Sequence, residues 1–546
     1  MSAESPTPDG SPVVYLSDAP DDDLTSSVPP DWADVAQAFV PEAPVSEAFA
    51  PPPPSAPELP ELDLLSLVLE ATGAGASPPS PNSVQVLRNL VREAAADGEA
   101  LREFKNLLAC AVARLDQLVT RQINRILHHP RFQQLEASWR GLHYLVEHSD
   151  SEEGIKVRML NASWSELARD VERALEFDQS TLFHKVYEDE FGMPGGEPFG
   201  VLIGDYSIRH QSTADHPIDD ISVLTSISQV AAAAFAPFIA SVHPSVLGLD
   251  QFSGLELPLN LERLFEQKEY LRWKLFRESV DSRFVGLTLP RVLMRLPYEE
   301  STFSSEQFCF REDVSSSQGN NYLWGNPAYA LGAVLTRSFS RSRWLADIRG
   351  VRRGEEGGGL VTGLPIASFE TDAQGVALRF PTDITITDLQ ERALAELGLI
   401  PLCVCKDTEF CAFYGNQSVQ KAKAYTDASA TANARISAML QYILCASRFA
   451  HYLKIIGRDK TGSVADPYEL SNYLSNWLMK YTLDDANASP DMKARYPLRG
   501  FEVNVREQPD KPGAFFCELL LLPHSQWDEL SLGVRLVTDL APLRSV

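Results

Sequence analysis

Hydrophobic positions follow a helical period most clearly between residues 99 and 128. Apolar side chains recur there mostly every three or four residues, so they share one face of a helix that we expect to be buried. Pro130 marks the end of this helix, and shorter helical patterning precedes it from residue 84 to about 96. The apolar positions are Leu101, Phe104, Leu107, Leu108, Ala111, Leu115, Leu118, Val119, Ile123 and Ile126.

Beyond residue 150, short apolar runs alternate with helical patterns. This interleaving predicts an α/β fold, a mixed and mostly buried sheet flanked by helices. We expect strands at 155–160, 199–204, 237–241, 284–289, 401–406 and 410–414. We expect helices at 163–177, 218–234, 327–349, 388–397, 428–457 and 467–481.

The last part of the chain changes to a period of two. Apolar residues alternate with polar ones from residue 501, which is typical of a half-exposed strand. The turn-forming residues 509–513 then lead into another apolar run, and we expect an antiparallel C-terminal β unit. Its strands are predicted at 501–506, 515–522 and 532–537.

The first 60 residues depart from both patterns. They are acidic and rich in proline, and no Lys or Arg occurs before Arg88. Such a segment cannot bury enough apolar surface to offset the entropy lost on ordering, so we expect a disordered N-terminal extension over 1–60. Within it, Val13–Leu16 is a candidate strand that would pair with another part of the molecule.

A short apolar segment, Glu61–Ala71, follows the extension. It is too short to hold as an isolated helix, but as a docked helix it offers an apolar stripe to a partner. The stripe consists of Leu62, Leu64, Leu65, Val68 and Leu69. The predicted divisions are the extension (1–60), this partner-binding helix and its linker (61–83), an N-terminal helical region (84–150), an α/β core (151–425), and C-terminal helices with a β-hairpin (426–546).

Charge and hydropathy narrow the class of protein. The formal net charge is −26, which argues against binding to nucleic acid or to anionic membranes. No apolar run approaches the roughly 18–20 residues that a membrane span needs. The N-terminus lacks the basic and then apolar regions of a secretory signal, so we expect a cytoplasmic protein without membrane insertion.

Candidate chemistry is sparse. The P-loop pattern GxxxxGK[ST], HExxH and GxSxG are all absent, and the glycine-rich stretches 192–200 and 354–363 are better explained as loops. Cys403, Cys405 and Cys411 lie in apolar surroundings, which favours reduced structural thiols over a metal site. We therefore predict no enzyme activity, no cofactor and no catalytic or metal-binding residues.

A few polar groups leave alternatives open. His128 is predicted to cap or pack at a helix end, and His451 to lie on the polar face of an amphipathic helix. Acidic residues 188–190 and Asp205 allow acid–base work in principle, but an acidic chain offers many such pairs by chance. The basic cluster Arg349, Arg352 and Arg353 is either solvated surface or engaged in local ion pairs, or it contacts an acidic partner surface.

Several longer strings resemble one family. They are FQQLEASWRGLHYLV (132–146), GGEPFGVLIGDY (195–206), AFAPFIASVHPSVLGLD (234–250), ESVDSRFVGLTLPRVLMRLPY (278–298) and ATANARISAMLQYILCASRFAHYLKIIGRDK (430–460). In this order, over about residues 61–543, they resemble the large subunit of the type VI secretion contractile sheath, the TssC/VipB family, also called ImpC/EvpB.

The resemblance implies a structural role. Such a subunit pairs with a small TssB/VipA-like sheath subunit and polymerises with copies of itself around an inner tube protein, on a baseplate, and contraction propels the tube. Exchanged β-strands near chain termini join neighbouring subunits, and a ClpV-type ATPase disassembles the contracted sheath by engaging an N-terminal helix. The stripe Leu62, Leu64, Leu65, Val68 and Leu69 is our candidate unfoldase-binding segment. The candidate strand-exchange residues are Phe501, Val503, Val505, Phe515 and Phe516.

Two alternatives remain. The acidic extension raises the possibility of a divergent paralogue that acts as a baseplate component or regulatory adaptor of the same machine. An enzyme with an unrecognised site would require a cleft with several convergent ionisable groups whose pKa values are perturbed.

Overall fold

The computed structural model describes most of the chain from residue 98 onward and one N-terminal segment. The described residues are 12–18, 98–149, 154–193, 195–257, 259–299, 304–305, 308–314, 321–352, 356–368, 378–405, 408–460, 467–485, 487–507, 515–524 and 534–540. The chain divides into two compact units. The first comprises residues 1–19, 130–296 and 314–546, and the second comprises residues 20–129 and 297–313.

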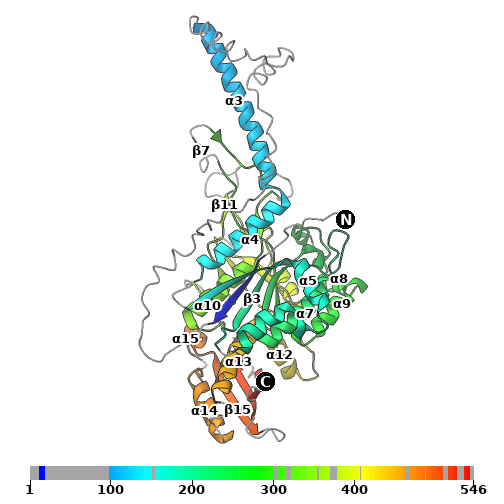
Figure 1. Cartoon of the computed structure of the whole chain (residues 1–546), viewed down its shortest axis with the longest axis vertical. Helices are drawn as coiled ribbons and strands as arrows, with labels where there is room; N and C mark the ends of the chain where they lie inside the picture. The colour runs from blue at the N-terminus through cyan, green and yellow to red at the C-terminus, as the bar shows by residue number, and fades with distance from the viewer. Residues whose placement is uncertain are drawn as a thin grey trace, which may run out of the picture. The chain divides into compact units, whose positions relative to one another are not determined.

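The first unit is built on a mixed sheet (Figure 1). Its described strands lie in the order β10-β14-β13-β5-β4-β3-β1-β2. The central strands β3, β4, β5 and β13 run parallel, and the strands toward both edges pair antiparallel. Their bounds are β1 (Pro12–Asp18), β2 (Ile155–Asn161), β3 (Phe199–Ile208), β4 (Phe238–Val242), β5 (Val285–Leu289), β10 (Leu360–Val361), β13 (Ile400–Val404) and β14 (Cys411–Phe413). The predicted α/β fold with a mixed sheet is confirmed.

Helices cover both faces of this sheet. Leu202 of β3 packs into a buried cluster with Leu224 and Ile227 of α7. The next residue, Ile203, points to the other face and packs with Leu331 of α10. A strand buried on both faces needs apolar residues at consecutive positions, which explains the run FGVLI. The main helices are α4 (Pro130–Glu147), α5 (Trp164–Arg173), α7 (Asp220–Ala234), α9 (Leu271–Glu278), α10 (Ala328–Ser342), α11 (Asp388–Glu396) and α13 (Leu440–Lys460).

Two glycines set how closely these layers approach. A Cβ atom at Gly141 of α4 would lie 2.3 Å from Cδ2 of Tyr329 on α10. A Cβ atom at Gly332 of α10 would lie 2.6 Å from Cδ1 of Ile203 on β3. Only glycine permits both contacts, so these positions bring α4, α10 and the sheet together.

Local sequence signals fix several helix starts. Ser163 and Glu166 form a capping box at the start of α5, and Thr387 and Gln390 form another at the start of α11. Shorter elements surround the main sheet or lie in the second unit. They include β6 (Val292–Leu293) with β9 (Trp324–Gly325), β7 (Ser304–Ser305) with β8 (Phe308–Cys309), β11 (Ala367–Ser368) with β12 (Leu378–Arg379), α6 (Thr181–Phe183), α8 (Leu261–Phe265), and a π-helix, His184–Gly192.

The C-terminal part forms a separate antiparallel sheet, as predicted. Its strand order is β15-β16-β17, and helices accompany it in sequence. The elements are α12 (Ala428–Ser437), α14 (Pro467–Met479), α15 (Pro490–Arg495), β15 (Leu498–Glu507), β16 (Phe515–Pro523) and β17 (Val534–Leu540).

The single helix predicted over 428–457 is wrong, because α12 and α13 are separate helices. At the break, the N–H of Leu440 donates to the carbonyl of Asn416 at 2.8 Å. The carbonyl of Ala438 accepts from the N–H of Ser418 at 2.9 Å. These bonds to a distant segment replace the intrahelical bonds that a continuous helix would make.

The predicted polar face around His451 is also wrong. Arg448 and His451 are almost fully buried. The guanidinium of Arg448 lies 4.5 Å from the ring centroid of Phe339 and 5.4 Å from that of Trp344. His451 Nε2 lies 2.9 Å from the carbonyl oxygen of Ala234. Aromatic rings from other elements therefore surround these polar side chains instead of water.

The second unit contains the long helix α3 (Gly98–Leu127), close to the predicted bounds. Near its end, Asn124 accepts a hydrogen bond from the N–H of Asp313, and His128 lies 3.2 Å from a carboxylate oxygen of Glu312. The expectation of a buried apolar face is wrong for several positions, which are 43–50% exposed within this chain. They are Leu108, Leu118, Val119 and Ile126.

The N-terminal extension is described only in part. Pro12–Asp18 forms β1 and includes the candidate strand Val13–Leu16, so this piece of the expected disordered segment is ordered as a strand. Residues 19–97, with the predicted unfoldase-binding segment, lie outside the described residues. In the described part of the chain, no helix is long and apolar enough to cross a membrane.

Candidate functional site

The C-terminal sheet has one buried face. On β16, the alternate residues Phe515, Cys517, Leu519 and Leu521 are buried, and the residues between them are partly exposed. The buried residues pack with Phe449 of α13 and with leucines of α14. The period of two in the sequence therefore reports the inner and outer faces of this sheet.

The predicted strand-exchange residues divide between these faces. Phe501, Val503 and Val505 of β15 stand opposite Leu521, Leu519 and Cys517 of β16. Together with Phe515, they pack against the subunit's own core, whereas Phe516 lies on the partly exposed face. Four of the five side chains thus stabilise the hairpin itself, and a joining strand would use its main chain.

The two outer strands of this sheet, β15 and β17, each have β16 as their main partner among the described strands. Beyond Leu498, which bridges to Thr482, β15 pairs with β16 alone among the described strands. On the opposite side, β17 likewise has β16 as its one described strand partner. An edge strand presents N–H and C=O groups that can pair with a strand from another chain. The exposed side chains Glu502, Arg506 and Glu507 near this edge are charged, which discourages indiscriminate pairing.

An aromatic cluster holds this sheet against the rest of the first unit. The ring of Trp344, just after α10, stacks on Phe449 of α13 with 4.5 Å between centroids. Tyr481, after α14, packs edge-on to Trp344 at 5.3 Å, and Trp477 of α14 packs edge-on to Phe449 at 5.8 Å. These contacts join three helical segments, so the C-terminal sheet is carried on a well-packed base.

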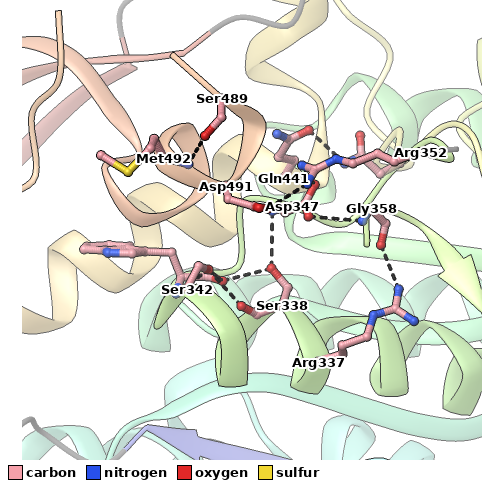
Figure 2. Close-up of polar contacts among 12 residues, drawn as sticks. Arg337, Ser338, Ser342, Asp347, Arg352, Gly358, Gln441, Ser489, Asp491 and Met492 are labelled. Atoms are coloured by element: carbon pink, nitrogen blue, oxygen red, sulfur yellow. Dashed lines mark hydrogen bonds and ion pairs between the residues drawn. The ribbon is translucent and has the colours of Figure 1, made fainter. Parts of the chain in front are cut away.

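A polar cluster joins the same region to the core (Figure 2). Arg352 donates to Asp347 at 2.7 Å and to Asp491 of α15 at 2.9 Å. Asp347 also accepts from the N–H of Gly358 at 3.1 Å, and its own N–H donates to Ser338 of α10 at 3.3 Å. The local-ion-pair alternative is therefore confirmed for Arg352. The sequence did not predict Asp491 as the partner of Arg352, because the two residues are 139 positions apart.

A cavity of about 450 Å³ lies at the carboxyl ends of β3 and β4, where an enzyme of this fold class would hold its substrate. Its ionisable groups are already engaged. Asp220, which does not itself line the cavity, accepts from Trp164 Nε1 at 2.6 Å and from the N–H of Arg209 at 2.8 Å, and it contacts His216; these three partners do line the cavity. These bonds tie the walls of the cavity together.

Burial favours the neutral form of two further groups at this cavity. Burial raises the pKa of Asp205, whose carboxylate accepts from Ser138. Burial, followed by the charges of Arg209 and Arg291, lowers the pKa of His243 to about 4. His243 Nδ1 accepts from the N–H of Ser245 as a local helix cap. We interpret the cavity as structural, because the acidic and basic side chains around it form hydrogen bonds that hold its walls together.

The cysteine prediction fits the described thiols in part. Cys403 and Cys411 are buried, and burial raises the pKa of both thiols to about 12, which keeps them protonated. Cys405 is only partly buried. Within the described ranges, no group of three or more His, Cys, Asp or Glu residues is arranged to hold a metal ion.

Two family models and one similar protein sequence agree on one family. Residues 109–420 match the model of the EvpB/VC_A0108 tail sheath N-terminal domain, and residues 429–540 match that of the EvpB/VC_A0108 tail sheath gpW/gp25-like domain. The chain is 41% identical over 445 residues to the type VI secretion system sheath protein TssC1 of Pseudomonas aeruginosa, covering 81% of this chain and 86% of that protein. A chain in a cryo-EM structure of the anti-feeding prophage (AFP) baseplate, 6-fold symmetrised, is similar at a TM-score of 0.29 and 10% identity, over 57% of this chain and 64% of that one.

Proposed function

Because the chain belongs to the EvpB/VipB family of type VI secretion tail-sheath proteins, we propose that it pairs with a small sheath subunit, polymerises into a tube and contracts. The family is a structural sheath family and not an enzyme class. The inner tube protein would lie inside this tube, and a baseplate would anchor it. Contraction would be a collective shift between two packings of the same subunits.

The outer edges of β15 and β17, which pair with no further strand among the described residues, support polymerisation most directly. The inward side chains of β15 and β16 pack against α13 and α14, so added strands would extend the sheet without repacking its core. Main-chain hydrogen bonds supply affinity in such strand addition, and side chains set the register. Phe516 and Leu520 on the partly exposed face would then contact whatever covers the added strand.

The exposed apolar face of α3 supports pairing with a second protein. Monomers rarely leave a long row of large apolar side chains in water, and such a surface marks a protein contact. Leu108, Leu118 and Ile126 lie on this face, each at least 43% exposed. We propose that the small sheath subunit covers it.

Disassembly of the contracted sheath would depend on a separate ATPase. The chain lacks a P-loop, so ATP hydrolysis would belong to a ClpV-type partner. In this proposal the ATPase engages the stripe Leu62, Leu64, Leu65, Val68 and Leu69 after contraction. The ATPase partner and the cytoplasmic location come from the family resemblance and the sequence.

A deletion strain carrying a fluorescent small sheath subunit tests the role. Loss of this chain should abolish both the elongated fluorescent structures and the release of the inner tube protein, and the intact gene should restore both. If secretion is lost while the elongated structures still form normally, the chain acts as a baseplate or regulatory adaptor instead.

A further inference from the structure

The short helix α15 lies on a loop whose two ends are bonded to each other. The N–H of Leu483 donates to the carbonyl of Leu498 at 2.8 Å, and the N–H of Leu498 donates to the carbonyl of Tyr481 at 3.2 Å. Pro497, next to Leu498, accepts from the N–H of His524, just after β16, at 3.1 Å. These bonds fix both ends of the loop to the C-terminal sheet, and none of them involves α15.

The helix itself is held to the core by a weak contact. Of its six residues, Ala494 alone is buried. Asp491 accepts from Arg352 at 2.9 Å (Figure 2), although the Asp491 side chain is 76% exposed. Arg352 also donates to the better-buried Asp347 at 2.7 Å, so it would stay in place if Asp491 left. An ion pair with such an exposed partner contributes little to stability, and salt screens it.

Unfilled space lies on both sides of α15. A cavity of about 590 Å³ lies between this helix and α10, and its lining includes Arg341 and Arg495. A second cavity, of about 320 Å³, is lined in part by Lys493 of α15 and by Tyr442 and Cys445 of α13. Closely packed interiors leave few voids larger than a water molecule. Helix α15 therefore makes fewer packing contacts than a core helix would, and little apolar contact is lost when it moves.

We propose that α15 is a hinged strap that swings away from the core when its latch, the Arg352–Asp491 ion pair, breaks. The hinges of the strap are the bonded ends of its loop at Leu483 and Leu498. Opening joins the two cavities into one recess between α10 and α13. The C-terminal sheet stays packed during this local opening, because neither the bonds at the loop ends nor the aromatic cluster involves α15. The strap is a property of the single chain and goes beyond the proposed function.

Two native thiols distinguish opening of the strap from unfolding of the sheet. Cys445 is buried and lines the cavity beside α15, whereas Cys517 has no exposed surface and lies on the inner face of β16. Burial raises the pKa of the Cys445 thiol to about 12, so this thiol stays protonated and unreactive while the strap is closed. The full chain is treated with N-ethylmaleimide under native conditions, and peptide mass spectrometry follows the labelling of each cysteine.

Asp491→Asn removes the charge of the latch, and Asp484→Asn is the matched control. Asp484 lies on the same loop and pairs with Arg499 of β15 at 3.5 Å, so its ion pair does not reach the core. Asp491→Asn should speed labelling of Cys445 roughly two- to fivefold, as expected for loss of an exposed ion pair, and leave Cys517 unchanged. Asp484→Asn should change neither rate. Added salt should speed labelling of Cys445 in the unaltered chain and have less effect in Asp491→Asn.

Equal labelling of Cys445 in Asp491→Asn and Asp484→Asn would overturn the latch. Parallel increases at Cys445 and Cys517 would overturn the hinge, because they would show that the whole C-terminal sheet opens. The chain is labelled alone, so neither result depends on sheath assembly.

Discussion

Replacing Leu519 by Ala tests the assignment of faces in the C-terminal sheet. Leu519 has no exposed surface and lies in the middle of β16, opposite Val503 of β15 and Leu536 of β17. Removing a fully buried leucine side chain costs about 2–5 kcal/mol, because apolar transfer energy is lost and a cavity remains. The next residue, Leu520, is partly exposed, so the same substitution should cost below about 1 kcal/mol.

Amide hydrogen exchange over residues 515–523 measures this difference locally, which suits a chain with more than one unit. Since about 1.4 kcal/mol corresponds to a tenfold change, Leu519→Ala should speed exchange by at least about 30-fold. Leu520→Ala should speed it by less than about fivefold. Equal effects, or a larger effect at Leu520, would refute the assigned faces and the register between β15 and β16.

Three further predictions concern assembly, recycling and pH. Val503→Pro removes a ladder donor and should impair polymerisation, measured as sedimenting polymer, more than pairing with the small subunit, measured as co-purified partner. Asn504→Pro is the matched variant, because its N–H points the opposite way. Equal loss of polymer and of partner in both variants would contradict an edge role. Leu64→Asp with Leu65→Asp should weaken pull-down of the ClpV-type ATPase and leave sheath assembly unchanged. Unchanged binding of the ATPase would show that the unfoldase-binding segment lies elsewhere in the chain. Burial lowers the pKa of Lys454 from 10.5 to about 8. Between these pH values the unfolded chain binds more protons than the folded chain, so the free energy of unfolding should rise with pH. Lys454→Met should flatten this rise in urea unfolding, and an unchanged dependence of the unfolding free energy on pH would contradict the prediction.

The main elements could be predicted because their signals are local. The apolar runs at 199–204 and 284–289 became β3 and β5, since a strand buried on both faces needs consecutive apolar residues. The alternation at 501–506 gave the correct inward set, Phe501, Val503 and Val505. Capping sequences such as Ser163 with Glu166 likewise act over three residues.

The errors arose where distant segments decide the outcome. The break between α12 and α13 depends on backbone bonds to residues 416–418. Arg448 and His451 are buried because the Phe339 ring of α10 packs on Arg448 and the Ala234 carbonyl of α7 contacts His451. The position of β1 depends on two strands more than 130 residues away. The apolar face of α3 has helical periodicity but is exposed within this chain. Periodicity predicts an apolar face and does not say whether the same chain buries it.

Negative-stain electron microscopy of the chain co-expressed with its small sheath subunit tests the central claim most directly. The account predicts tubular particles of uniform diameter that contain both proteins. It also predicts fewer or shorter tubes for Val503→Pro at equal expression. Persistent monomers or isolated heterodimers, with the correct partner present and bound, would contradict the assignment of this chain as the polymerising subunit.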